Sequence, residues 1–166
     1  MRNLTRTTAA ALAAIAAGAL AGQAQAKHGA PKFKQPSLKR GVLTVEGTKG
    51  DDRIALRVAA QNANFLAIDF GDDGSNEFFV RRALVSRIEV DAGYGDDQIR
   101  IDDANGAFTD TIPTVLRGEQ GDDTLLGGAG AETLRGGHGD DTIDGNRGND
   151  SAFMGAGDDT FIWDPG

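Results

Sequence analysis

The chain lacks cysteine altogether and has only two histidines in 166 residues. Without cysteine there are no disulfide bonds, no thiolate zinc sites and no cysteine nucleophile. The two histidines, His28 and His138, lie far apart in the sequence, so there is no H-E-x-x-H zinc helix, and the G-x-S-x-G elbow of serine hydrolases is also absent. These absences predict that the protein is not an enzyme.

Positive charge is scarce, with 17 basic residues against 25 acidic ones and a formal net charge of −8. The imbalance is concentrated after Gly118, where Arg135 and Arg147 are the only lysine or arginine residues. Such a surface is unfavourable for nucleic acid and for anionic membranes. We therefore expect cations as partners, no nucleic acid and no membrane insertion.

The first 26 residues have the features of an export signal. Two arginines precede an apolar run that ends at Leu20, and a small-x-small cleavage site ends at Ala26. The run is too short and too rich in alanine to span a bilayer. We expect residues 1–26 to be a cleaved signal peptide and the mature protein to be secreted, either extracellular or periplasmic. Residues 27–40 are basic and without periodicity, which predicts an extended linker.

Residues 41–117 are predicted to be β-rich throughout, because they contain short alternating stretches bounded by Gly, Asn or Asp. The expected strands are 42–46, 53–58, 65–70, 77–80, 87–91 and 98–102. The pair at 65–80 is joined by Gly-Asp-Asp-Gly-Ser-Asn, which predicts an antiparallel hairpin. Asp69, Asp72 and Asp73 of this piece lack the spacing of an EF-hand, so a structural role is favoured over a separate metal loop.

Five consecutive nine-residue units occupy 118–162 without insertion. They are GEQGDDTLL, GGAGAETLR, GGHGDDTID, GNRGNDSAF and MGAGDDTFI. Each unit has a glycine-rich first half, which allows a tight turn, and a second half in which one apolar residue stands between polar ones, as in a short half-buried strand. The apolar eighth positions are Leu125, Leu134, Ile143, Ala152 and Phe161.

Two units are expected to make one coil, so that eighth positions face each other across a thin core and alternate turns stack on one edge. The chain is therefore predicted to be all-β, a parallel β-roll or β-helix of stacked turns. Stacking places Asp123, Asp141 and Asp159 in one column and Glu132 and Asp150 in another. Carboxylates at a strand spacing of roughly 4.8 Å repel unless a cation lies between them, and an oxygen-rich, flexible cage suits Ca²⁺.

These units closely resemble the hemolysin-type repeats-in-toxin (RTX) family, with its nonapeptide G-G-x-G-x-D-x-U-x. The unit at 136–144 matches every defined position, and the unit at 154–162 misses only the first. The resemblance implies Ca²⁺ held between same-side turns of a β-roll. Glu132, which replaces the aspartate, is expected to fit its site poorly. The implied metal-binding residues are Gly118, Gly121, Asp123, Gly127, Glu132, Gly136, Gly137, Gly139, Asp141, Gly145, Asp150, Gly155, Gly157 and Asp159.

The same pattern occurs singly at 47–55 and 92–100, with Asp52 and Asp97 in the acidic position as weaker metal candidates. These units are interpreted either as divergent coils of one continuous roll, which is favoured, or as Gly-Asp turns between strands. The expected organisation is then a β-rich part at 41–117 followed by a calcium-binding roll at 118–166.

The sequence supports two hypotheses for function. The favoured one is an exported calcium-binding repeat protein whose roll folds on binding Ca²⁺ and acts as a structural or adhesive extracellular module, with a cell-surface or extracellular-matrix partner. The alternative is an accessory or truncated part of a larger secreted hydrolase, which a catalytic partner polypeptide would favour.

Overall fold

The computed structural model describes residues 21–22 and 33–162. Within these residues the regular structure is β-strand, apart from two short 3-10 helices, η2 (Arg82–Leu84) and η3 (Asp103–Asn105). No helix in this part of the chain has the length and apolar character needed to cross a lipid bilayer. Most of the predicted signal peptide, the start of the basic linker and Trp163 lie outside the described residues.

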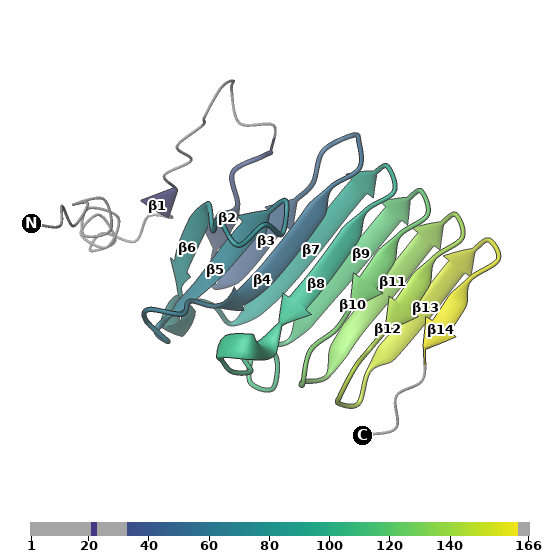
Figure 1. Ribbon diagram of the computed structural model, residues 1–166. Coiled ribbons are helices and arrows are strands. Elements are labelled where there is room, and N and C mark those ends of the chain that lie inside the picture. The colour runs from purple at the N-terminus through teal and green to yellow at the C-terminus, as the bar shows by residue number, and fades with distance from the viewer. Residues whose placement is uncertain (1–20, 23–32, 163–166) are drawn as a thin grey trace, which may run out of the picture.

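The strands form two sheets in two layers, with the core between them (Figure 1). The eight-stranded sheet has the order β1 (Ala21–Gly22), β6 (Phe78–Arg81), β5 (Phe65–Phe70), β4 (Arg53–Val58), β8 (Gln98–Asp102), β10 (Thr124–Leu126), β12 (Thr142–Asp144) and β14 (Thr160–Ile162). The six-stranded sheet has the order β13 (Ser151–Ala156), β11 (Glu132–His138), β9 (Thr114–Gln120), β7 (Arg87–Tyr94), β3 (Val42–Glu46) and β2 (Ser37–Lys39). From β7 onward the chain passes from one sheet to the other at every turn, which makes the fold a parallel β-roll.

The nine-residue period sets the register of the roll. Leu125 pairs with Ile143 between β10 and β12, and Leu134 pairs with Ala152 between β11 and β13, all in parallel. Leu125, Leu134 and Ile143 are fully buried. The prediction that the eighth positions form the core column is therefore confirmed for these units, and two units make one coil.

The last eighth position differs from the prediction. Phe161 pairs with Ile143 but remains 44% exposed. The reason is its place in β14, which is the last strand of its sheet among the described residues, so no further coil covers it.

The strands of the two sheets are unequal in length, whereas the nine-residue pattern predicts one turn and one short strand in every unit. The strands β10, β12 and β14 have three residues each, but β11 continues through the next pair of glycines to His138. Gly137 keeps strand pairing with Glu119 and Gly155 at a φ of 129°, a conformation that favours glycine. The glycine-rich half is thus partly strand on the six-stranded sheet.

The roll extends well before residue 118. In the eight-stranded sheet Ile54 pairs with Ile99, and Ile99 pairs with Leu125, both in parallel. Ile54 and Ile99 of the units at 47–55 and 92–100 therefore lie in the same column as the repeats, the arrangement expected of divergent coils. Strand β9 begins at Thr114, so the two sheets run through position 118 without a break.

Two insertions interrupt the coils. The predicted hairpin is confirmed as β5 and β6, which pair antiparallel and extend the eight-stranded sheet beyond β4. The second insertion, 103–113, was not predicted. It contains η3 and buries Phe108 completely in the core.

The prediction of an extended linker at 27–40 is wrong at its C-terminal end, because residues 37–39 form β2, which pairs antiparallel with β3. Its apolar residues explain the difference. Phe33 stacks on Phe70 with ring centroids 4.4 Å apart, and Leu38 packs against the core. Two apolar side chains thus tie a basic segment to the roll.

Candidate metal centre

We call the side on which the chain passes from the six-stranded to the eight-stranded sheet the first edge, and the opposite side the second edge. A ladder of sixth-position aspartates runs along the first edge. In each step, a backbone N–H donates to the Oδ1 of the equivalent aspartate in the following coil. The steps are Asp52 to Asp97 (2.7 Å), Asp97 to Asp123 (2.9 Å), Asp123 to Asp141 (2.9 Å) and Asp141 to Asp159 (3.0 Å).

The second oxygen of these carboxylates is left without a partner. The Oδ2 atoms of Asp97, Asp123 and Asp141 are buried and accept no hydrogen bond from the described residues, and the side chains are 3%, 1% and 1% exposed. An unsatisfied buried polar atom costs roughly 1–3 kcal/mol, and a charged one costs more. Such an atom recurs at three successive turns of the first edge. These turns are therefore suited to binding a cation, which the free carboxylate oxygens would coordinate.

Glycines shape the space around these oxygens. A Cβ at Gly136 would lie 2.2 Å from Asp141 Oδ2 and 2.4 Å from the carbonyl oxygen of Met154. A Cβ at Gly139 would lie 2.2 Å from the carbonyl oxygen of Gly121. Only glycine permits this approach of backbone carbonyls and carboxylates, and a set of hard oxygen donors is the kind that Ca²⁺ prefers.

Burial also changes the acidity of the column. It raises the pKa of Asp123 from 3.8 to about 7 and the pKa of Asp97 to about 6, against the lowering effect of the backbone N–H that each carboxylate accepts. Burial likewise raises the pKa of Asp141. Without a cation, the ionised column is therefore unfavourable in the folded roll.

This acidity predicts that protons partly replace the metal. Because the folded pKa values of Asp97 and Asp123 lie above the ordinary value of 3.8, their contribution to stability is fully present below about pH 4 and is lost as pH rises through about 6 to 7. In excess chelator, we expect a higher thermal midpoint and more β signal in circular dichroism at pH 5 than at pH 8. The calcium-loaded protein is the control, in which this trend should be much smaller. A metal-free protein that is less ordered at pH 5 than at pH 8 would contradict the argument.

The second edge repeats the arrangement with a glutamate. The Glu132 N–H donates to Asp150 Oδ1 at 2.8 Å, and a Cβ at Gly148 would lie 1.5 Å from the carbonyl oxygen of Gly130. Glu132 is only 2% exposed, since its longer side chain turns back to accept the Gly128 N–H at Oε2, 3.0 Å away. Its Oε1 has no partner among the described residues, and burial, followed by the nearby Asp150, raises its pKa.

A second acidic column on the first edge was not predicted. The fifth-position aspartates are exposed, and their N–H groups bond in the reverse direction, each donating to the Oδ1 of the preceding coil. The steps are Asp96 to Asp51 (3.1 Å), Asp122 to Asp96 (3.0 Å), Asp140 to Asp122 (2.8 Å) and Asp158 to Asp140 (2.8 Å). The recurring Asp-Asp pair in the sequence is the signal that could have identified this column.

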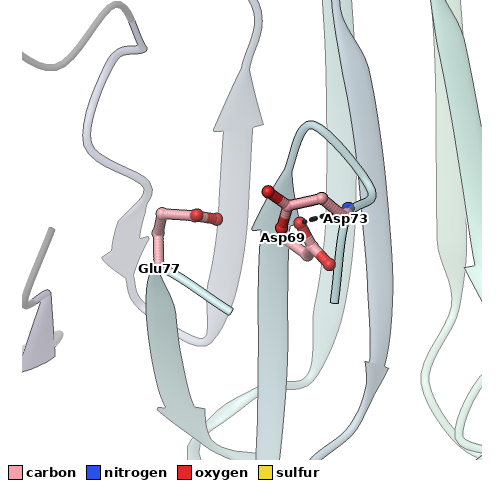
Figure 2. A group of neighbouring side chains, drawn as sticks. All are labelled: Asp69, Asp73 and Glu77. Atoms are coloured by element: carbon pink, nitrogen blue, oxygen red, sulfur yellow. Dashed lines mark hydrogen bonds between the residues drawn. The ribbon is translucent and has the colours of Figure 1, made fainter. Parts of the chain in front are cut away.

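Three further carboxylates gather in the hairpin. Asp69, Asp73 and Glu77 approach one another closely (Figure 2). Asp69 is fully buried, and its Oδ2 accepts from Arg57 at 3.0 Å and from the Gly74 N–H at 2.9 Å. This oxygen is therefore already satisfied, which agrees with the structural role expected for this piece.

The remaining aspartate of the hairpin connection also binds arginine. Asp72 accepts from Arg57 at 2.8 Å and from Arg100 at 2.7 Å. The Arg100 guanidinium, more than any other neighbour, lowers the pKa of Asp72. These ion pairs join the hairpin to β4 and β8, so the role of Asp72 is structural rather than metal binding.

Comparison with known families supports this interpretation of the turns. Residues 115–137 and 126–161 match the family model of the RTX calcium-binding nonapeptide repeat in four copies. The segment 115–161 consists of RTX repeats. Repeats of this type bind calcium, and the matched residues include the predicted sites from Gly118 to Asp159. No curated protein and no solved structure matches the chain.

The RTX segment thus contains both the Asp123–Asp141–Asp159 column and the Glu132–Asp150 pair. The turns at Asp52 and Asp97 lie outside the matched residues, although Asp97 shares the buried, unpartnered oxygen of Asp123 and Asp141. His138 is exposed at the end of β11.

Proposed function

We propose that the protein is an exported calcium-binding module whose β-roll folds when Ca²⁺ binds between stacked turns. The observation that carries the proposal is the repeated buried oxygen without a partner, at Asp123 and Asp141, beside glycines that expose backbone carbonyls. Ca²⁺ takes six to eight oxygen ligands in flexible geometry, so carboxylates and carbonyls from neighbouring turns would hold it.

In this proposal, binding and folding are one event. The turns contribute acids that repel one another when brought to strand spacing, and the ligand groups come from coils that meet only after folding. Bound metal supplies free energy that the thin core cannot supply alone, in a chain with no disulfide bonds. Extracellular calcium modules work with dissociation constants of ~10⁻⁴–10⁻³ M, which suits a protein that folds after export.

The proposed role outside the cell is structural or adhesive, with no enzymatic activity. Residues 1–26 would direct export and be removed, and a cell-surface or extracellular-matrix component would be the partner. Two features support this proposal. The sequence has an export-type leader, and most acids of the repeats belong to the two aspartate ladders or to the Glu132–Asp150 pair.

The proposal is tested by two neighbouring substitutions with the same change in charge. Asp141→Asn should lower calcium affinity roughly tenfold or more, because Asp141 lies between the turns of Asp123 and Asp159 and its Oδ2 is buried without a partner. Asp140→Asn should have little effect, because Asp140 is exposed. Isothermal titration calorimetry measures both. Equal losses in the two variants would contradict the assignment of the buried column as the metal site.

A further inference from the structure

The 103–113 insertion takes the place of a repeat turn on the second edge. A Cβ at Gly130 would lie 2.2 Å from the carbonyl carbon and from the oxygen of Thr109, much as one at Gly148 would meet the carbonyl of Gly130. The Gly130 N–H also donates to Thr109 Oγ1 at 3.2 Å. The second edge therefore has three stacked layers, of which only two are nonapeptide turns.

Oxygen atoms from the insertion and from the repeat converge around Gly128. The position of a Gly128 Cβ is 2.9 Å from Thr109 Oγ1 and 3.1 Å from Asp103 Oδ2. The Gly128 N–H donates to Glu132 Oε2 at 3.0 Å. Two carboxylates and a hydroxyl thus surround one glycine, and Thr109 and Glu132 are only 3% and 2% exposed.

The other oxygen of each of these two carboxylates has no partner. Asp103 Oδ1 and Glu132 Oε1 are both buried and accept no hydrogen bond from the described residues. A cavity of about 570 Å³ is lined by Asp103 and Gly128. Arg100 and Arg147 also line this cavity, but Arg100 is already paired with Asp72 and Asp102, and Arg147 is exposed. Among the described residues, no ion pair joins either arginine to Asp103 or Glu132, so the charge of these two acids is available to another cation.

We propose that Asp103, Thr109 and Glu132 bind a calcium ion at the junction of the insertion and the first second-edge repeat turn. The site rests on the proposed function, but two of its three ligands, Asp103 and Thr109, lie outside the nonapeptide pattern and outside the matched repeats. In this proposal Glu132 contacts both the ion at the insertion and, through its backbone N–H, Asp150 of the next second-edge turn. The longer side chain of glutamate is suited to this position. Calcium at this site joins the 103–113 insertion to the roll.

The site is tested by counting bound calcium in the full chain with native mass spectrometry and calorimetry. Asp103→Asn and Thr109→Val should each lower the number of bound calcium ions by one at saturating calcium. Thr109→Ser, which keeps the hydroxyl, should retain the wild-type number. Asp110→Asn is the matched control, because Asp110 is an exposed acid of the same insertion and should leave the count unchanged. Asp103→Asn keeps the size of the side chain, so circular dichroism of this variant should show an intact roll, even if the Thr109→Val variant unfolds.

The outcomes separate this inference from the proposed function. A wild-type chain that binds no calcium overturns both. If Asp141→Asn loses calcium while Asp103→Asn retains the full count and affinity, only the site at the insertion is overturned. Loss of one ion in Asp103→Asn, with the count unchanged in Asp110→Asn, supports it.

Discussion

In excess chelator at pH 8, the repeat segment of the protein should be largely disordered, and millimolar Ca²⁺ should restore its β structure. The column from Asp97 to Asp159, buried as far as Asp141, brings carboxylates to strand spacing, and burial raises the pKa of Asp97 to about 6 and that of Asp123 to about 7, so their ionised forms are unfavourable in the folded roll. Calcium neutralises the column and links coils that have no disulfide bond between them.

Far-UV circular dichroism of the metal-free and calcium-loaded chain measures this transition, and hydrogen exchange locates it. Mg²⁺ is the control, because it requires a smaller octahedral site and dehydrates reluctantly, so it should not substitute. We expect the strongest exchange difference in β10 to β14, and a weaker one in β5 and β6, which pair antiparallel in the hairpin, outside the carboxylate ladder, and contribute to the apolar core. Identical spectra with and without chelator would exclude calcium-dependent folding.

Ile143→Asp should abolish calcium-induced folding even though every proposed ligand remains in the chain. Ile143 is fully buried in β12, where it pairs with Leu125 on one side and Phe161 on the other. An unpaired charge at this place costs several kcal/mol, a large part of the stability of a small domain. Calorimetry should then show no cooperative calcium binding and dichroism no β signal.

Two controls separate burial from charge and from shape. Thr160→Asp adds the same charge at an exposed position of the adjacent strand and should fold with calcium. Ile143→Val keeps an apolar side chain and should cost only about 0.5–1.5 kcal/mol. If Ile143→Asp folds with calcium as the wild type does, the eighth positions are not the core on which metal binding depends.

The nine-residue period determined most of this roll by itself. Each unit has an apolar residue at the eighth position, which must be buried, and an acid at the sixth, which needs a cation. Both requirements are met together only if alternate turns stack. Stacking predicts the pairing of Leu125 with Ile143 and the column through Asp123 and Asp141. Alternation also predicted β3, β4, β5 and β8 at their observed boundaries. Local periodicity suffices here because each coil contacts mainly its neighbours.

Only the tertiary structure decided what breaks the period. The stacking of Thr109 beneath Gly130, the return of the Glu132 side chain to its own turn and the pairing of β2 with β3 join residues through contacts that no repeat spacing encodes. The sequence shows that Glu132 is longer than aspartate, but not that Asp103 and Thr109 lie beside Gly128. Those contacts depend on the path of an insertion around the buried Phe108, and such a path is set by three-dimensional packing rather than by local pattern.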